Sequence, residues 1–457
     1  MEFRKAHRTP YENFLQSKYE MWTGEVLVRS HPYYLVLDPT SHCQLRCPSC
    51  PTGVENASRK TGGTVRFRER TMLDAGVYDG LLDELGDYLF LIMFYNWGEP
   101  LLNRNLPALI RKARARDICA EIHSNLSLKL SDEYIEDLLT SGIDLIAGSI
   151  DGFSQETYET YRRGGRFETA KRNLERLVAK RDQLGLKTEI IWNFLVFAFN
   201  EHEIEATRRY CEDIGATFNQ REAFITDPDW LPSYRKRELD PPAAAESPRP
   251  RVAGLAATGS SACAWHYGYT AINANGTVSP CCAPWEQSHD FGVINAGVSS
   301  FAGIWNNDHF RKSRAAFSGK TVKGLDQLTT ICLECPYGSG IQHLYSGLDG
   351  NVVAQFRRIL RGTDAALDRA FDLLPDPRAF VEFYRYALAG RAEGRTDGAE
   401  LVKISLDDPS VARRASAYEA MKSTLRPLYR GVLRRHPALH GWAKKVDAAL
   451  KRHHGAR

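Results

Sequence analysis

The feature that most constrains the fold of this chain is a repeated alternation of apolar runs with amphipathic segments. Six runs have the composition of β-strands, the last more weakly than the others, and they cover residues 33–40, 88–96, 119–125, 144–150, 189–197 and 216–224. Nearly continuous apolar strands bounded by turn residues indicate a parallel sheet that is covered on both faces. We therefore predict an α/β fold, which is either an open doubly wound sheet or a partial (β/α)6 barrel.

The segments between these runs predict helices. They cover 71–85, 106–117, 131–142, 167–185 and 201–215, and each places apolar residues at helical spacing. Ser131 and Asp132 give the third segment a start signal, and Gly142 gives it a stop signal.

Four strand ends carry polar or glycine-rich turns. The stretch "SHCQLRCPSCPTG" follows the first run, "NWGEP" closes the second, "SNLS" closes the third and "SIDG" closes the fourth. In parallel α/β folds, ligands bind at the carboxyl ends of the strands. The turns therefore predict a cofactor site at one edge of the sheet.

The first of these turns contains three cysteines, Cys43, Cys47 and Cys50, separated by three and then two residues. Soft thiolates select zinc, copper(I) or iron–sulfur clusters, and a structural zinc site needs four protein ligands. On a cluster that usually takes four cysteines, three thiolates leave one iron open to an outside ligand. An iron–sulfur cluster is the first interpretation, and a zinc site completed by His42 or a remote cysteine is the alternative.

Composition excludes several classes of protein. Ten cysteines in 457 residues, without an export signal, argue against a disulfide scaffold and for metal or redox chemistry. A formal charge of +4 is too small for binding nucleic acid by overall charge. No run approaches the roughly 20 apolar residues of a membrane span. We expect a soluble, cytoplasmic protein with neither a membrane nor a nucleic-acid partner, in which the isolated Cys119 and Cys211 are small buried hydrophobes.

The motif Cys43-x3-Cys47-x2-Cys50, after the first strand of a six-unit β/α pattern, resembles the radical S-adenosylmethionine (radical SAM) superfamily. The resemblance implies that these cysteines hold a [4Fe-4S] cluster whose open iron binds SAM. It also implies that an external reductant such as flavodoxin or ferredoxin supplies one electron, which cleaves SAM to methionine and a 5'-deoxyadenosyl radical. That radical takes a hydrogen atom from an unactivated carbon.

Two further turns resemble SAM-binding motifs of the superfamily. "WGEP" resembles its Gly-Gly-Glu turn, with Trp97 in place of the first glycine, which implies that Gly98 and Glu99 hold the methionine amino group. Ser124 and Asn125 resemble its Thr-Asn-Gly turn.

The fourth strand end extends the resemblance. Ser149 and Asp151 resemble the Ser-x-Asp-Gly segment near the SAM ribose, and Arg162 is implied to pair with the methionine carboxylate. Ser49 departs from the family, because the residue before the third cysteine is usually aromatic or aliphatic and packs on adenine.

The later cysteines resemble the SPASM/twitch extensions, in which a β-hairpin and a following turn hold an auxiliary [4Fe-4S] cluster. "AINANGTVSP" predicts the hairpin, with "NG" in its turn. The implied ligands are Cys263, Cys281, Cys332 and Cys335. Cys282 is the alternative to Cys281, and zinc is the alternative to the cluster.

The predicted organisation has five parts. They are a lead-in (1–32), the partial barrel (33–226), a Pro-, Ala- and Ser-rich flexible linker (227–262), the auxiliary-cluster domain (263–340) and a helical, basic extension (341–457). The extension is expected to be a helical cap with a solvated charged face, and docking to an anionic carrier or RNA is the alternative. The basic loop 52–71 is either a lid over the cluster or a solvated loop.

A single auxiliary cluster resembles enzymes that oxidise or epimerise sugars and aminocyclitols. We therefore expect hydrogen abstraction from a hydroxyl-bearing carbon of a sugar-like or aminocyclitol substrate, giving epimerisation or dehydrogenation. In the enzymes that this arrangement resembles, a cysteine thiol can return a hydrogen atom to give epimerisation, and Cys282 is the first candidate for this donor, followed by Cys211 and Cys119. One alternative is a maturase that modifies a ribosomally made peptide. The other is a non-catalytic iron–sulfur protein that either binds nucleic acid or has a regulatory role.

Overall fold

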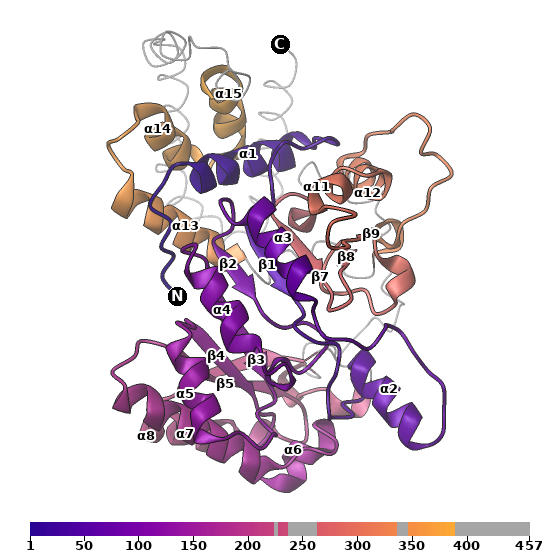
Figure 1. Cartoon of the computed structure of the whole chain (residues 1–457), viewed down its shortest axis with the longest axis vertical. Helices are drawn as coiled ribbons and strands as arrows, with labels where there is room; N and C mark the ends of the chain where they lie inside the picture. Colours follow the sequence, from indigo (N-terminus) through magenta and orange to yellow (C-terminus); the bar gives the residue numbers. More distant parts are fainter. Residues whose placement is uncertain (224–226, 236–262, 336–345, 389–457) are drawn as a thin grey trace, which may run out of the picture. The chain divides into compact units, whose positions relative to one another are not determined.

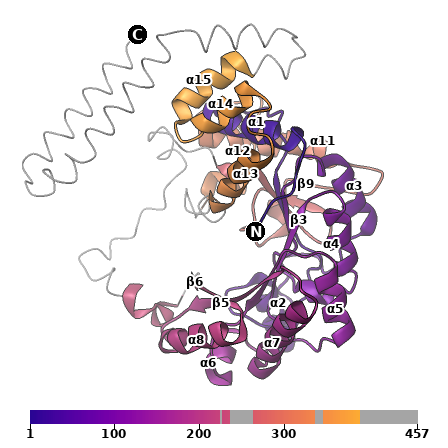
Figure 2. The same ribbon diagram turned by 90° about the vertical axis from the view of Figure 1, so that its left-hand side faces the viewer.

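The computed structural model describes residues 1–223, 227–235, 263–335 and 346–388, shown in two views in Figures 1 and 2. The chain divides into one unit from Met1 to Asp364 and a second that begins at Ala365. The predicted domain boundaries remain predictions. Most of the predicted linker (236–262), the stretch 336–345 and the tail from 389 onward lie outside the described residues.

The six predicted strands are present. They are β1 (Tyr34–Leu37), β2 (Leu91–Met93), β3 (Cys119–Ser124), β4 (Leu145–Ser149), β5 (Glu189–Val196) and β6 (Thr217–Glu222). They pair in chain order, and every pair is parallel. The predicted α/β class is therefore confirmed, with an open, partial arrangement in which β6 is an edge of the described sheet.

Helices connect these strands. They are α2 (Pro51–Lys60), α3 (Ala75–Leu85), α4 (Leu106–Arg114), α5 (Asp132–Thr140), α6 (Gln155–Tyr161), α7 (Phe167–Gln183) and α8 (Ile204–Ile214). The hydroxyl of Ser131 accepts a hydrogen bond from the backbone N–H of Tyr134, as its N-cap position predicts. Helices α2 and α6 were not predicted, because α2 is polar and α6 is short.

The two faces of the sheet differ in chemistry because side chains alternate along each strand. Trp192 on β5 packs against Phe167 of α7 and Tyr210 of α8, so this face is the apolar, helix-covered one. Figure 2 shows α4, α5, α7 and α8 along that side. The neighbouring Asn193 belongs to the other face, on which it pairs in register with Ser149 and Asn219. We call this second face the inner face.

The predicted hairpin joins the same sheet. β7 (Tyr269–Ile272) and β8 (Thr277–Ser279) are antiparallel, Gly276 has φ 79° in the turn, and β9 (Gly292–Val293) pairs with β8. The hairpin was expected as a separate small extension, but β7 pairs in parallel with β1 from Tyr34↔Tyr269 to Leu37↔Ile272. The hairpin that precedes Cys281 and Cys282 is thus hydrogen-bonded to β1, the strand that leads to the Cys43 loop.

The other α-helices described in the first unit are α1 (Thr9–Thr23), α11 (Phe301–Trp305), α12 (Asp308–Ser318) and α13 (Ser346–Ile359). The second unit contains α14 (Ala365–Leu373) and α15 (Pro377–Ala387), which agrees with the predicted helical extension as far as it is described. No helix within the described part of the chain is long and apolar enough to cross a membrane.

Candidate functional site

The three early cysteines lie on one loop directly after β1. Cys47 is buried with Leu45, Tyr161 and Phe197, and Cys43 and Cys50 pack against the same cluster. Cys50 occupies the N-cap position of α2, and its carbonyl accepts the N–H of Val54 at 2.8 Å. A Cβ at Gly53 would lie 2.2 Å from the carbonyl oxygen of Cys47, so only glycine permits this approach of α2 to the loop.

The loop is held by hydrogen bonds from both sides. The side-chain amide of Asn56 on α2 donates to the carbonyl oxygens of Cys43 (2.8 Å) and Leu45 (2.6 Å). The backbone N–H of Arg46 donates to the carbonyl of Arg163 at 2.9 Å. The cysteine loop is therefore anchored to the segment that follows α6 as well as to α2.

The "WGEP" turn is anchored by Asp38, the residue directly after β1. Its buried carboxylate accepts the N–H groups of Trp97 (3.3 Å) and Gly98 (3.2 Å). A Cβ at Gly98 would lie 1.5 Å from the carbonyl oxygen of Thr40, so the turn requires glycine here. Burial raises the pKa of Asp38 to about 7, against the opposing effect of these backbone donors. Sequence reasoning missed Asp38, although an acidic residue at the end of an apolar strand was the available signal.

Glu99 meets the turn that closes β3. Its carboxylate accepts hydrogen bonds from the Ser124 hydroxyl (2.6 Å) and the Asn125 backbone N–H (2.8 Å). Gln44, on the cysteine loop, donates to the side-chain oxygen of Asn125 at 2.8 Å. Burial raises the pKa of Glu99, and the Ser124 and Asn125 hydrogen bonds oppose that rise. The structure thus brings together the predicted residues of three strand ends.

The fourth strand end is occupied by an ion pair. Arg162 Nε lies 2.5 Å from Asp151 Oδ2, and Asp151 is fully buried. The other oxygen of Asp151 accepts the N–H of Leu195 at 2.8 Å. Burial raises the pKa of the Cys47 thiol, and the nearby Arg162 guanidinium opposes that rise. Arg162 therefore lies beside the cysteine loop, already paired with Asp151, whereas Ser149 stays half-buried on the inner face.

The later cysteines form a second group. The pKa of Cys263 is raised to about 12, mainly by burial and in part by the neighbouring thiols of Cys335 and Cys282. Burial likewise raises the pKa of Cys281, with Cys282 and Cys332 adding to the shift. The four predicted ligands and Cys282 are therefore close enough to interact electrostatically. The contact of Cys332 Sγ with His266 Nε2, at 3.4 Å, was not predicted.

The early and late groups of cysteines both offer thiol ligands, the ligand type that iron–sulfur clusters take. All ten cysteines are free, and the grouped ones are buried or half-buried thiols. Within the described ranges, no three or more His, Cys, Asp or Glu side chains are arranged to hold one metal ion. Thiolates of a cluster bind different irons, so they need not converge on a single point. The isolated Cys119 and Cys211 are fully buried, as expected.

A polar network on the inner face was not predicted as part of the site. The Tyr95 and His123 rings stack at 4.0 Å, and the Tyr95 hydroxyl donates to Glu121 at 3.3 Å. Asn193 Nδ2 lies 3.4 Å from His123 Nδ1, and Asn219 donates to Asn193 at 2.7 Å. The alternation of Glu121 and His123 with apolar residues in the third run was the available signal.

Burial sets the charge of this network. It lowers the pKa of His123 to about 3, so the imidazole is neutral. It raises the pKa of Glu121 to about 7, and the Tyr95 hydrogen bond and the charge of Arg221 oppose that rise. The network thus presents neutral hydrogen-bonding groups and one carboxyl that exchanges a proton near neutral pH.

The basic loop 52–71 is not simply a solvated loop. Its first part is helix α2, and Arg68 in its second part is buried in an ion pair with Asp290. The expectation of a solvated loop is therefore wrong for this part of the segment, and the alternative of a lid over the cluster stays a prediction.

Comparisons with known proteins agree with the two cysteine groups. Residues 37–211 match the family model of the radical SAM superfamily, and residues 263–336 match that of SPASM, an iron–sulfur cluster-binding domain.

Two curated relatives illustrate the range of matches. A probable GTP 3',8-cyclase of Methanococcus maripaludis is 29% identical over 132 residues, which is 29% of this chain and 42% of that protein. The chain thus spans less than half the length of this relative. A PqqA peptide cyclase of Xanthomonas axonopodis pv. citri is 24% identical over 332 residues, which is 67% of this chain and 80% of that protein.

Two solved structures are also similar. BtrN in complex with AdoMet and 2-DOIA aligns with a TM-score of 0.36 and 18% identity, over 64% of this chain and 89% of that one. Streptococcus suis SuiB bound to S-adenosylmethionine aligns with a TM-score of 0.45 and 14% identity, over 67% and 72%. Two family models are thus matched in order along the sequence, and the chain carries a radical SAM superfamily domain followed by a SPASM iron–sulfur cluster-binding domain.

Proposed function

We propose that this radical SAM enzyme reductively cleaves SAM and abstracts a hydrogen atom from a hydroxyl-bearing carbon of a polar small molecule. The observation that carries the proposal is the junction of three strand ends. Gln44 of the cysteine loop reaches Asn125, and Ser124 and Asn125 hold Glu99. Residues distant in the sequence are thereby held at one edge of the sheet, where a cofactor bound to the cysteine loop would contact them.

The cofactors follow from the two groups of thiols. In this proposal Cys43, Cys47 and Cys50 hold a [4Fe-4S] cluster with one open iron. A second [4Fe-4S] cluster is held by Cys263, Cys332, Cys335 and either Cys281 or Cys282. When bound, the first cluster and SAM supply the oxidant that removes a hydrogen atom from carbon.

The surrounding residues bind and orient the cofactor. Asp38 holds the backbone of the Trp97–Glu99 turn, so Gly98 and Glu99 are positioned before SAM arrives. Glu99 is proposed to bind the methionine amino group, with Ser124 and Asn125 fixing its carboxylate. Arg162 is proposed to bind the methionine carboxylate, and its pairing with Asp151 holds the guanidinium beside the cysteine loop. Ser149 and Asp151 remain proposed neighbours of the ribose.

The substrate class is proposed from the inner face. Tyr95, Glu121, His123, Asn193 and Asn219 form a connected row of hydrogen-bonding side chains on this face. Sugars and aminocyclitols present hydroxyl groups that such a row can bind. In dehydrogenation, the substrate radical left by hydrogen-atom abstraction would pass its remaining electron to the auxiliary cluster, and a carboxyl that titrates near neutral pH can accept the hydroxyl proton released in that step. We propose epimerisation or dehydrogenation of such a substrate, with Cys282 as the hydrogen donor for epimerisation if Cys281 is the cluster ligand.

Modification of a ribosomally made peptide is the second candidate. One observation favours it: the match to PqqA peptide cyclase covers 67% of this chain and 80% of that protein, a span longer than either matched domain. Peptides also bind through hydrogen bonds to backbone and side-chain groups, so the inner face suits this class as well.

The deciding experiment is anaerobic reconstitution with iron and sulfide, reduction with dithionite and assay of SAM for 5'-deoxyadenosine and methionine. We expect about eight irons per chain and SAM cleavage. Deuterated sugars and aminocyclitols are then compared with deuterated peptides for label transfer to 5'-deoxyadenosine. Label from a peptide alone would reject the small-molecule proposal in favour of the second candidate. If the clusters assemble but SAM is not cleaved in the presence of either substrate class, the catalytic proposal is wrong and the chain is a non-catalytic iron–sulfur protein.

A further inference from the structure

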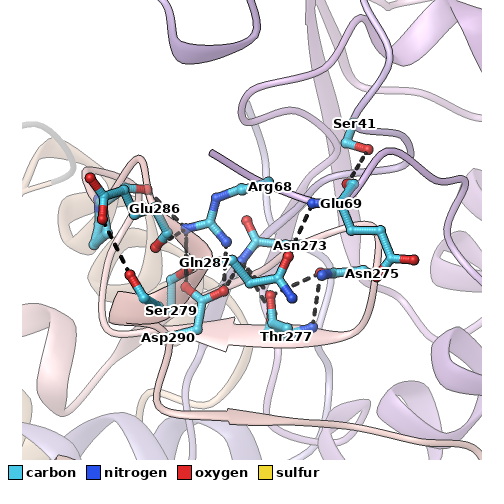
Figure 3. Close-up of polar contacts among 12 residues, drawn as sticks. Ser41, Arg68, Glu69, Asn273, Asn275, Thr277, Ser279, Glu286, Gln287 and Asp290 are labelled. Carbon is cyan, nitrogen blue, oxygen red and sulfur yellow. Dashed lines mark hydrogen bonds and ion pairs between the residues drawn. The ribbon is translucent and has the colours of Figure 1, made fainter. Parts of the chain in front are cut away.

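A buried arginine connects the segment after α2 to the turn that carries Cys281 and Cys282. Figure 3 shows Arg68 directed toward Asp290, Ser279 and Glu286. Its guanidinium donates to both carboxylate oxygens of Asp290, at 2.5 and 3.0 Å. The side chains of Arg68 and Asp290 are only 7% and 4% exposed, so this is a buried, two-point ion pair.

The other hydrogen bonds of the Arg68 guanidinium go to residues on either side of Cys281 and Cys282. The guanidinium donates to the Ser279 hydroxyl at 3.3 Å and to the carbonyl oxygens of Pro284 at 2.9 Å and Glu286 at 3.5 Å. Ser279 precedes Cys281, and Pro284 follows Cys282. One guanidinium thus closes the cysteine-bearing turn by binding both of its ends.

The hairpin supports the same contacts. The Ser279 hydroxyl donates to Asp290, and the side-chain amide of Asn273 donates to Ser279 Oγ (2.8 Å) and Thr277 Oγ1 (3.1 Å). Asn273 is 3% exposed and directly follows β7. The network therefore joins the turn to the strand that pairs with β1.

Helix α2 connects the backbone around Arg68 to the first cysteine loop. Glu55, on α2, accepts the backbone N–H groups of Phe67 (2.6 Å) and Arg68 (3.2 Å) and the guanidinium of Arg70 (3.0 Å). Helix α2 begins directly after Cys50. Arg68 is consequently held in place by the helix that leaves the first group of thiols while it binds the turn of the second.

We propose that Arg68 is a positioning residue that fixes the Cys281–Cys282 turn to α2, so that the auxiliary iron–sulfur cluster is assembled and held at a set position relative to the first. This inference rests on the cysteine assignment of the proposed function. It adds that the auxiliary site depends on a side chain from the radical SAM domain. The auxiliary cluster is then expected to load poorly when Arg68 is removed, although Arg68 is not itself a ligand.

The test measures the auxiliary cluster alone. The background variant carries Cys43→Ala, Cys47→Ala and Cys50→Ala, which leaves only the later thiols. After anaerobic reconstitution we expect about four irons per chain in this background and about one or fewer when Arg68→Met is added. Arg59→Met is the matched control, because Arg59 is an exposed arginine in the last turn of α2. It is expected to leave the iron content unchanged.

Further variants separate positioning from loss of the fold. Arg68→Lys keeps the charge but not the two-point geometry, and is expected to restore part of the cluster with an altered electron paramagnetic resonance spectrum. The double variant Arg68→Met with Asp290→Asn removes the unpaired buried carboxylate, so it should fold even if Arg68→Met does not. A folded double variant with full auxiliary iron and an unchanged spectrum overturns the inference.

Two failures remain distinguishable. If the background variant binds no iron with Arg68 intact, the proposed auxiliary site is wrong, and this inference is wrong with it. If the background variant loads fully and Arg68→Met loads equally with an identical spectrum, only the inference about Arg68 is wrong.

Discussion

The carboxylate of Glu99 accepts a hydrogen bond of 2.6 Å from the hydroxyl of Ser124. Glu99 ends the turn after β2 and Ser124 is the last residue of β3, so this contact fixes two neighbouring strand ends to each other. Both residues are buried, at 2% and 1% exposure, and the contact therefore operates in a low-dielectric environment. The orientation of Glu99 is set by the protein before any ligand binds.

Replacing Glu99 by Gln is predicted to weaken SAM binding without removing the first cluster. The amide nitrogen cannot accept a hydrogen bond, so Ser124 or the N–H of Asn125 loses its acceptor at a cost of about 1–3 kcal/mol. We expect SAM affinity to fall about tenfold or more. The measurement is the SAM-induced change in the electron paramagnetic resonance signal of the reduced cluster. Glu222→Gln, at an exposed residue of β6, is the control. Unchanged affinity in Glu99→Gln would contradict the assigned role.

Replacing Cys47 by Ala is predicted to remove the first cluster and SAM cleavage together. Iron content should fall from about eight to about four per chain, because the auxiliary thiols are unaffected. Cys211→Ala is the control, since Cys211 is a buried thiol of α8 outside both groups. Iron analysis and detection of 5'-deoxyadenosine provide the measurements. Retention of SAM cleavage in Cys47→Ala would rule out the ligand assignment.

Replacing Arg162 by Met is predicted to destabilise the fold by about 3–5 kcal/mol, because it leaves the fully buried carboxylate of Asp151 without its cation. Adding Asp151→Asn should recover part of this loss, since the second substitution removes the unpaired charge. Urea unfolding of both single variants and the double variant measures the coupling. A loss below about 1 kcal/mol for Arg162→Met would show that the pair contributes little to stability.

Replacing Glu121 by Gln is predicted to stabilise the protein increasingly as pH rises. The folded pKa of Glu121 is about 7, above its ordinary value of 4.5, because burial disfavours the charge. Between these values the unfolded chain releases the proton first, so the stability of the parent falls as pH rises and then levels off above about 7. Gln removes this penalty, which is on the order of 3 kcal/mol at most.

Chemical denaturation from pH about 5 to about 8 measures this difference between Glu121→Gln and the parent. Glu136→Gln is the control, because Glu136 is an exposed residue of α5, where substitution has little effect on stability. A stability difference that does not widen with pH would show that Glu121 ionises freely in the folded protein.

The order and type of the six main strands followed from the sequence because strands buried on both faces need nearly continuous apolar residues. The cysteine groups and the turns at the strand ends also followed, since the carboxyl ends of parallel strands share one edge of a sheet. Predicted strand boundaries were too long, as for 88–96 against Leu91–Met93, because apolar residues continue into the loops beside the strand.

Other parts of the site required the tertiary structure. Asp38 acts through backbone N–H groups about sixty positions away in the sequence, and Arg68 pairs with Asp290 across more than two hundred. The inner-face network joins residues from β3, β5 and β6, and β7 pairs with β1. The sequence by itself determined which cysteines and polar residues stand at the strand ends and which element each belongs to, because those signals are local. Only the tertiary structure decided which of them meet, because burial and hydrogen bonding between distant segments depend on how the sheet is assembled.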